Sequence, residues 1–347
     1  MKYKFYTTSE KAWQGMLAAI KEARHYIYWE SYIFYPDVEG GYLTQEIFQA
    51  LAEKARTGIE VKIIADYWGS FFFSAKARKF LEDFGAEVLF FKGHKIFGRN
   101  HKKILIIDGK VAFIGGVNLA KHHKDWLDLH LRLESGGVIN YLQRSFTRSY
   151  YKAGGKDKIE LRKPQLAQWK VKFIEHWPAG KRRLLKRHYK DALDNARRSI
   201  LIATPYFVPH PWLVRRLHRA AKKGVLVSII IPEITDNFII NLANYCFASL
   251  VYLPGINFYF TKQFVHAKAL LIDDREGLIG SQNIDALSFD HNIEGGVIFQ
   301  RKDMVEELKK ILEDWQKDAK LLVFKQESRR WYNRLLEVIF KLLRPIL

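Results

Sequence analysis

The chain has 347 residues, of which 48% are hydrophobic and 14% aromatic, and its formal net charge at pH 7 is +20. This length and apolar content exclude a disordered chain and favour two domains, or two halves of one pseudo-symmetric unit. The single cysteine, Cys246, excludes an internal disulfide framework and fits a reducing compartment. The positive charge favours an anionic partner, such as a phosphorylated substrate, an acidic membrane surface or nucleic acid.

The N-terminus and the hydropathy pattern bear on membrane contact. Residues Met1–Ser9 include lysines but no apolar segment, so no signal peptide is expected. No run approaches the roughly 18 apolar residues that a spanning helix needs. We therefore expect peripheral contact with the cell membrane, at its cytoplasmic face.

Strands and helices alternate through the first part of the chain. The hydrophobic pattern predicts the end of a helix, a strand, a helix and a second strand over Ala18–Arg24, His25–Phe34, Tyr42–Arg56 and Ile59–Ala65. The aromatic run Trp68–Phe73 follows the second strand, where active-site loops often lie. It either packs in the core or contacts acyl chains.

The same order of elements returns in the second half. A helix, a strand, a helix and a strand are predicted over Lys186–Arg197, Ile200–Phe207, Pro211–Lys223 and Val225–Pro232. Gly58 and Gly224 occupy equivalent places at which a helix closes before a strand. Residues 135–185 have no visible counterpart and are expected to connect the halves. We predict an α/β fold of two similar halves, 1–160 and 161–326, each a mixed, mostly parallel β-sheet flanked by helices, with the active site between them.

Residues that carry chemistry repeat at one constant spacing. The pairs that stand 165 positions apart are His101 and His266, Lys103 and Lys268, Asp108 and Asp273, Gly115 and Gly280, and Asn118 and Asn283. Five matches at one offset are very hard to obtain by chance, so the chain is a duplication. Each copy contains His-x-Lys-x-x-x-x-Asp, and the apolar run after the lysine predicts a buried strand.

The repeated motif suits phosphodiester chemistry. Residues two apart on a strand share a face, so each copy presents an imidazole beside an ammonium. Two such faces allow one neutral histidine to attack phosphorus while the other protonates the leaving alkoxide, and the lysines and asparagines hold the non-bridging oxygens. The ammoniums supply the positive charge, so neither a metal nor another cofactor is expected. A single copy would favour an ordinary strand end, but two intact copies favour catalysis.

Two further acids follow the motifs at nearly equal distances. Asp128 stands 27 positions after His101, and Glu294 stands 28 positions after His266. We predict that they orient the histidines, as the acid of a catalytic triad does. Asp108 and Asp273 belong to the motif and are grouped with its catalytic residues, although their place at strand ends favours a structural part in the turn.

At these residues the sequence resembles the phospholipase D superfamily over nearly the whole chain, and more narrowly its bacterial cardiolipin synthase branch. The strings that carry the resemblance are Arg99-Asn-His-Lys-Lys-Ile, Gly115-Gly-Val-Asn, Trp126-Leu-Asp-Leu-His130, Thr204-Pro-Tyr-Phe-Val-Pro209, Gly224-Val-Leu-Val, Val265-His-Ala-Lys-Ala and Gly280-Ser-Gln-Asn-Ile-Asp285. The resemblance implies that His101 is the nucleophile and His266 the acid, an order that the pseudo-symmetry alone does not give. Asp285-Ala-Leu-Ser288 lacks an arginine common in the branch. The paired N-terminal membrane helices of longer members are not seen, so we expect a short form.

The last segment, 327–347, is predicted to form an amphipathic helix. Its charged residues trace one narrow stripe beside a wide apolar face, at Arg330, Arg334, Glu337, Lys341 and Arg344. Such a helix lies in a membrane interface with its cations at acidic headgroups, or docks on the protein or on a second copy. The sequence favours these alternatives about evenly.

Three functions remain open at this stage. The favoured one is a cardiolipin synthase-like phosphatidyltransferase, which passes a phosphatidyl group from a lipid such as phosphatidylglycerol to a lipid glycerol hydroxyl. The second is a phospholipase D-type hydrolase that uses water. The third is a metal-independent phosphodiesterase or nuclease, which the basic charge would serve although no nucleic-acid-binding signature accompanies the motifs. The sequence does not determine the oligomeric state.

Overall fold

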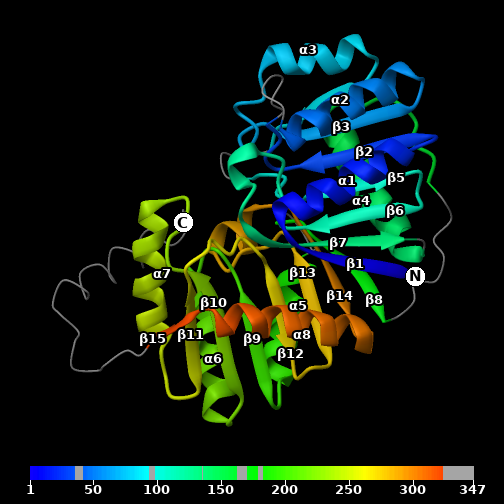
Figure 1. The fold of residues 1–347 in the computed structure, drawn as a ribbon. Coiled ribbons are helices and arrows are strands. Elements are labelled where there is room, and N and C mark those ends of the chain that lie inside the picture. Colours follow the sequence, from blue (N-terminus) through cyan, green and yellow to red (C-terminus); the bar gives the residue numbers. More distant parts are fainter. Residues whose placement is uncertain (36–41, 94–97, 135, 162–169, 179–182, 323–347) are drawn as a thin grey trace.

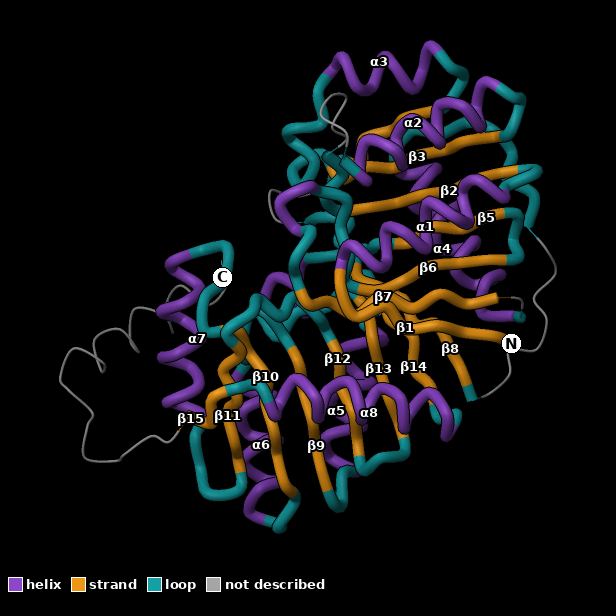
Figure 2. Tube along the Cα trace, in the orientation of Figure 1, coloured by secondary structure: helices purple, strands orange, loops and turns teal. Residues whose placement is uncertain are grey.

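The computed structural model describes residues 1–35, 42–93, 98–134, 136–161, 170–178 and 183–322. Two β-sheets form the molecule, the first-half sheet above the second-half sheet in Figure 1, and Figure 2 shows the same trace by secondary structure. The strand orders are β1-β7-β6-β5-β2-β3-β4 and β15-β11-β10-β9-β12-β13-β14-β8. The predicted amphipathic helix at 327–347 lies outside the described residues.

The first half alternates strands and helices as its hydrophobic pattern predicts. Its elements are β1 Lys2–Thr8, α1 Ser9–Glu22, β2 Tyr26–Ser31, α2 Leu43–Arg56, β3 Glu60–Asp66, α3 Ala75–Asp83, β4 Glu87–Phe91, β5 Ile104–Ile107, β6 Val111–Gly115, a short turn of helix at Lys121–His123, β7 Leu127–Glu134 and α4 Gly137–Lys152. Thr8 caps α1 by accepting a hydrogen bond from the Lys11 amide, and Gly58 closes α2 with a φ of 85°.

The second half repeats this order. Its elements are β8 Val171–His176, α5 Leu184–Asn195, β9 Ser199–Ala203, α6 Pro211–Lys222, β10 Leu226–Pro232, α7 Phe238–Val251, β11 Ile256–Thr261, β12 Ala269–Ile272, β13 Glu276–Gly280, a short π-helix at Leu287–His291, β14 Glu294–Phe299, α8 Lys302–Lys317 and β15 Lys320–Leu322. Gly224 closes α6 with a φ of 82°, as Gly58 closes α2.

The segment 135–185 is more than a connection, so that expectation was wrong. It contains α4, which follows β7 as α8 follows β14, and β8, which pairs antiparallel with β14 as β1 pairs with β7. The repeat was hidden because these elements carry no chemical residues to align. The boundary predicted near residue 160 falls between the two sheets and stays a proposal.

The prediction of two mixed α/β halves is confirmed, but the expectation of mostly parallel sheets was not correct. The parallel pairs are β2 with β3, β3 with β4, β9 with β10, and β10 with β11. The remaining pairs between the named strands are antiparallel. Tight turns join β5 to β6 and β12 to β13, and longer segments with a short helix join β6 to β7 and β13 to β14. Each buried motif strand therefore enters its sheet against the direction of β2 or β9.

The two halves share one hydrophobic core. Helices α1 to α3 cover the outer face of the first sheet, and α5 to α7 cover the outer face of the second. A third cluster joins the inner faces of both sheets, with Ile104 and Ile114 from one half and Leu271 and Val297 from the other, together with α4 and α8. Cys246 is buried in the outer layer of the second half, as a small apolar residue is.

Candidate active site

A cleft of about 460 Å³ lies between the two halves. Its lining includes Tyr32, His101, Asn118, His123 and Trp126 from the first half, and Tyr206, His266, Asn283, Asp285 and Asn292 from the second. Both motif histidines thus reach one cavity, although each stands just before a strand of a different sheet, β5 or β12.

Short backbone bridges between the halves fix the start of each motif. The amide of His101 donates to the Ile293 carbonyl at 2.9 Å, and the Ile293 amide donates to the Arg99 carbonyl at 2.8 Å. In the other copy the amide of His266 donates to the Leu127 carbonyl at 2.7 Å. Ile293 and Leu127 directly precede the two conspicuous acids, so each histidine is registered against the acid of the opposite half.

The acids contact the histidines crosswise. Nδ1 of His101 lies 3.0 Å from both carboxylate oxygens of Glu294, and Nδ1 of His266 lies 2.7 Å from Oδ2 of Asp128. Both acids are fully buried. A carboxylate accepts hydrogen bonds, so each Nδ1 carries the proton and each Nε2 is left with its lone pair toward the cleft. The matching distances along the sequence identified the two acids, but they associated Asp128 with His101 and Glu294 with His266. In the structure each acid contacts the histidine of the other half instead.

Each motif lysine folds back on its own histidine. Nζ of Lys103 donates to the His101 carbonyl at 2.7 Å. Nζ of Lys268 donates to the His266 carbonyl and lies 2.8 Å from Nε2 of that ring. The lysines are buried, so their charges lie in a region of low dielectric, where a phosphate anion would be strongly attracted.

The two asparagines both line the cleft but are held differently. Oδ1 of Asn118 accepts a hydrogen bond from the Ile33 amide at 3.2 Å. The backbone amide of Asn283 donates to Oγ of Ser288 at 3.1 Å, and within the described residues its buried Oδ1 has no partner. Asn283 therefore keeps a hydrogen-bond acceptor for a donor group of a ligand, such as a hydroxyl.

The structure separates Asp108 and Asp273 from the chemical residues of their motifs. Each lies at the far end of the motif strand, with φ near 50°, and accepts backbone amides rather than facing the cleft. Asp108 holds the amides of Arg24, His25 and Tyr26, and Asp273 holds the amides of Arg197, Arg198 and Ser199. Their position supports the structural interpretation and not the catalytic grouping.

Burial governs the protonation of the site. It lowers the pKa of His101, and it lowers that of His266 well below the usual value with the help of the charges of Lys268 and Lys103. Burial and the neighbouring Lys268 also hold the pKa of Lys103 well below its usual range. A bound phosphodiester anion would favour the charged forms of these groups, so protonation and substrate binding are coupled.

Some residues of the site escaped the sequence analysis. Oγ of Ser281 donates to Glu294 and supports it from behind, while Gly116, its counterpart, leaves room for Asp128. A side-chain carbon at Gly116 would come within 2.1 Å of Oδ1 of Asp128. Both residues stand in the Gly-x-x-Asn segments, so the signal was present. In the cleft wall, burial raises the pKa of Asp285 to about 7.

A family model described as "Cardiolipin synthase, PLD-like domain" matches residues 16–150 and 189–315. The chain belongs to the phospholipase D-like family. Cardiolipin synthase 2 of Bacillus anthracis is 31% identical over 98% of this chain and 70% of its own length. Cardiolipin synthase of Geobacillus kaustophilus is 30% identical over 98% of this chain and 71% of its own length.

A solved structure shares the fold of this phospholipase D-like chain. Phosphatidylserine synthase of Haemophilus influenzae Rd KW20 superposes with a TM-score of 0.75 at 16% identity, over 99% of this chain and 95% of that one. The matching family model and the relatives confirm the resemblance drawn from the motifs. Within the described part of the chain, no helix is both long and apolar enough to cross a membrane.

Proposed function

We propose that the protein is a cardiolipin synthase that works through a phosphohistidine on His101. Membership of the family makes it a phospholipase D-type phosphatidyltransferase. The observation that supports the finer assignment is the pair of histidines in one cleft, each held by a buried acid, together with relatives named cardiolipin synthase.

In the first step, Nε2 of His101 attacks the phosphorus of phosphatidylglycerol. The bond from phosphorus to the glycerol headgroup oxygen breaks, and protonated His266 donates its Nε2 proton to that oxygen, so glycerol leaves. In this proposal Lys103, Lys268 and the amide nitrogen of Asn283 bind the non-bridging oxygens; Asn283 lines the cleft, and each lysine stands two residues after a motif histidine. Glu294 stabilises the positive charge that develops on the His101 ring.

In the second step, the glycerol hydroxyl of another phosphatidylglycerol enters the cleft. His266, now neutral, takes the hydroxyl proton, and the oxygen attacks phosphorus, so the bond to His101 breaks and cardiolipin forms. His266 recovers its proton and His101 its lone pair. Water in place of the second lipid would give phosphatidic acid, the product of the hydrolase alternative.

Free access to Nε2 favours His101 as the nucleophile. Within the described residues its Nε2 has no hydrogen-bond partner, whereas Nε2 of His266 lies 2.8 Å from the Lys268 ammonium. An ammonium that donates to that nitrogen occupies the lone pair that an attack on phosphorus needs.

The reaction is tested with EDTA-treated protein and vesicles of labelled phosphatidylglycerol, with single- and double-stranded DNA in parallel. We expect cardiolipin and free glycerol. Phosphatidic acid without cardiolipin would establish the hydrolase instead, and cleaved DNA with unchanged lipid would overturn the lipid assignment.

The order of the histidines is tested by trapping the acid-labile phosphoenzyme. We expect His101→Ala to abolish both trapping and turnover, and His266→Ala to lower turnover by at least about a hundredfold, since it removes the general acid. His218→Ala is the matched control, because that ring lies on α6 and donates to the Val251 carbonyl away from the cleft. Trapping that survives in His101→Ala and disappears in His266→Ala would reverse the assignment.

A further inference from the structure

Two groups of large apolar side chains are exposed on the loops and helix that follow β3 and β10. The first patch, after β3, consists of Trp68, Phe71 and Phe72, which are 52%, 70% and 74% exposed. The second patch, at the start of α7, consists of Phe238 and Ile239, which are 74% and 51% exposed. Of the three phenylalanines in the aromatic run after β3, Phe71 and Phe72 are exposed and Phe73 is buried in the core. Exposed apolar groups of this size mark an interaction surface.

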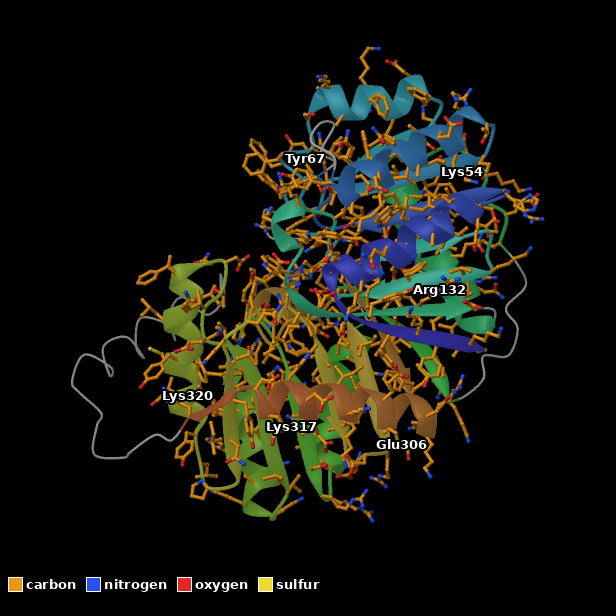
Figure 3. All side chains as sticks on the ribbon, in the orientation of Figure 1. Lys54, Tyr67, Arg132, Glu306, Lys317 and Lys320 are labelled. Atoms are coloured by element: carbon orange, nitrogen blue, oxygen red, sulfur yellow. The ribbon has the colours of Figure 1, made fainter. Side chains whose placement is uncertain are left out.

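The two patches occupy equivalent places in the repeat. Each follows the carboxyl end of the parallel strand that lies next to β2 or β9; the first patch precedes α3, and the second lies in the first turn of α7. In Figure 1, α7 lies on the left of the second half. Tyr67, which begins the loop of the first patch, is labelled on the left of the first half in Figure 3. The pseudo-symmetry thus gives each half one apolar patch on the same side of the molecule.

The second patch is continuous with the cleft. Asn237 caps α7, with Oδ1 accepting the Ile239 amide at 2.9 Å, and it also lines the cleft. Ile240 lines the cleft one residue beyond the patch. The first turn of α7 therefore exposes Phe238 and Ile239 at the surface, while Asn237 and Ile240 line the cleft.

The first patch reaches the cleft through a chain of aromatic rings. The Phe72 ring lies 5.5 Å from that of Tyr35, and Tyr35 lies 6.3 Å from His122. His122 contacts His123, a cleft residue, at 4.2 Å between ring centroids. Ring contacts thus connect the first patch with the wall of the cavity, and Ile240 connects the second.

The volume of the cleft limits which parts of a phospholipid substrate it can hold. A volume of about 460 Å³ is that of a pocket for a drug-sized molecule. It accommodates phosphate and glycerol groups but not the acyl chains of two phospholipids. The chains of both substrates must therefore remain outside the cavity, next to apolar surface at its rim.

Basic groups accompany the aromatic rim. Nζ of Lys92 lies 4.9 Å above the ring of Tyr67, the residue that precedes Trp68 of the first patch. The whole chain carries a net charge of +20. Aromatic side chains beside lysines suit an interface in which rings enter the headgroup layer and ammoniums meet acidic phosphates.

We propose that Trp68, Phe71 and Phe72, together with Phe238 and Ile239, form a membrane-docking surface that seats the mouth of the cleft on an anionic phospholipid bilayer. This inference rests on the proposed lipid substrate and names the surface by which that substrate is reached. Both patches enter the bilayer interface together, so the acyl chains stay in the membrane while the headgroups enter the cleft.

The test compares Phe71→Ser/Phe72→Ser and Phe238→Ser/Ile239→Ser with the unaltered chain. We expect each double variant to partition at least about tenfold less onto phosphatidylglycerol vesicles in sedimentation assays, because two large apolar side chains no longer enter the interface. Turnover of vesicles should fall in parallel, while turnover of a short-chain phosphatidylglycerol below its micellar concentration should stay within about twofold. Leu226→Ser is the control, since Leu226 is 51% exposed at the amino end of β10 and should leave binding unchanged.

The outcomes separate the surface from the reaction. Turnover of neither lipid form by the unaltered chain would remove the proposed function itself. Turnover of both forms with vesicle binding unchanged in the double variants would overturn the docking surface alone. Unchanged binding with a lowered melting temperature would mean that the patches pack on the chain itself. Double variants that turn a dimer into a monomer in sedimentation velocity, with vesicle binding unchanged, would mean that the patches cover a second copy of the chain. Each of the last three results rejects the bilayer as the partner of the patches.

Discussion

Single residues around the cleft owe their chemical state to burial. Burial lowers the pKa of His101 to about 4, against the opposing pull of Glu294, and it lowers the pKa of Lys268 to about 8, although Asp128 and Glu294 raise it. At neutral pH His101 is therefore uncharged and able to attack, while most Lys268 side chains keep their proton. With the pKa values of a free histidine and a free lysine, the pH range in which the histidine is neutral and the lysine charged would lie far higher, between about 6.5 and 10.4.

The pH profile of kcat/KM tests these two groups. The attacking form of His101 is lost as the pH falls through about 4, and the phosphate-binding charge of Lys268 is lost as the pH rises through about 8. We expect activity to fall on both sides of this window. Lys268→Arg should keep the acid limb and change the position of the alkaline one, because a guanidinium does not titrate in this range and only the loss of the His266 proton then remains on that side. An acid limb near 6.5, or an alkaline limb at the same pH in Lys268→Arg and the unaltered chain, would contradict this account.

At the scale of secondary-structure elements, a buried lysine joins parts of both halves. Lys102, between the two motif residues His101 and Lys103, is fully buried, with Nζ 3.1 Å from Glu30 on β2 and 3.0 Å from Glu175 on β8. It also donates to the hydroxyls of Ser145 and Ser149 on α4. One ammonium thus links a strand of the first sheet, a strand of the second sheet and the helix between them.

Removal of this ammonium should destabilise the fold. We expect Lys102→Met to lower the free energy of unfolding by about 3–5 kcal/mol, because Glu30 would remain buried without a cation. Urea unfolding measures the effect. Lys62→Met is the matched control, since Lys62 is also buried but pairs with Glu87 and Asp157, which are partly exposed and can be hydrated instead. An equal loss in the two variants would show that the link between the halves contributes nothing of its own.

Element by element, the sequence predicted what depends on local pattern and spacing. The alternation of helices and strands, the glycines after α2 and α6, and the duplication were all readable, because periodicity and turn chemistry are local. The crosswise contacts of Glu294 and Asp128 were not, because a register between two sheets depends on tertiary packing. Lys102 was equally hidden: a lysine in a motif gives no sign that it will be buried. The equivalence of α4 with α8 was missed for want of marker residues.

On the scale of the whole molecule, the shared core makes the halves dependent on each other. The inner faces of both sheets meet in one cluster with α4 and α8, so each half alone would expose a large apolar surface. Each half alone would also hold a histidine without its acid. The boundary near residue 160 is thus proposed as a limit of the repeat, not of an autonomous folding unit.

Separate expression of residues 1–160 and 161–347 tests this dependence. We expect each fragment to be insoluble or to lack cooperative thermal unfolding, and co-expression of the two to restore some soluble, active complex, since each covers the other's apolar face. Solubility, melting curves and turnover are the measurements. A single fragment that unfolds cooperatively on its own would show that the inner core is not required for folding.

The exchange of acids between the halves also has a consequence for the history of the chain. A single ancestral half could have built this site only as a two-fold symmetric dimer, in which both histidines were chemically identical. Fusion released the copies from that symmetry. Gly116 in the first half now corresponds to Ser281 in the second, and Lys102 corresponds to Ala267. Once the environments differed, one histidine was free to specialise in attack and the other in proton transfer, a division of labour that a symmetric dimer cannot encode in its sequence.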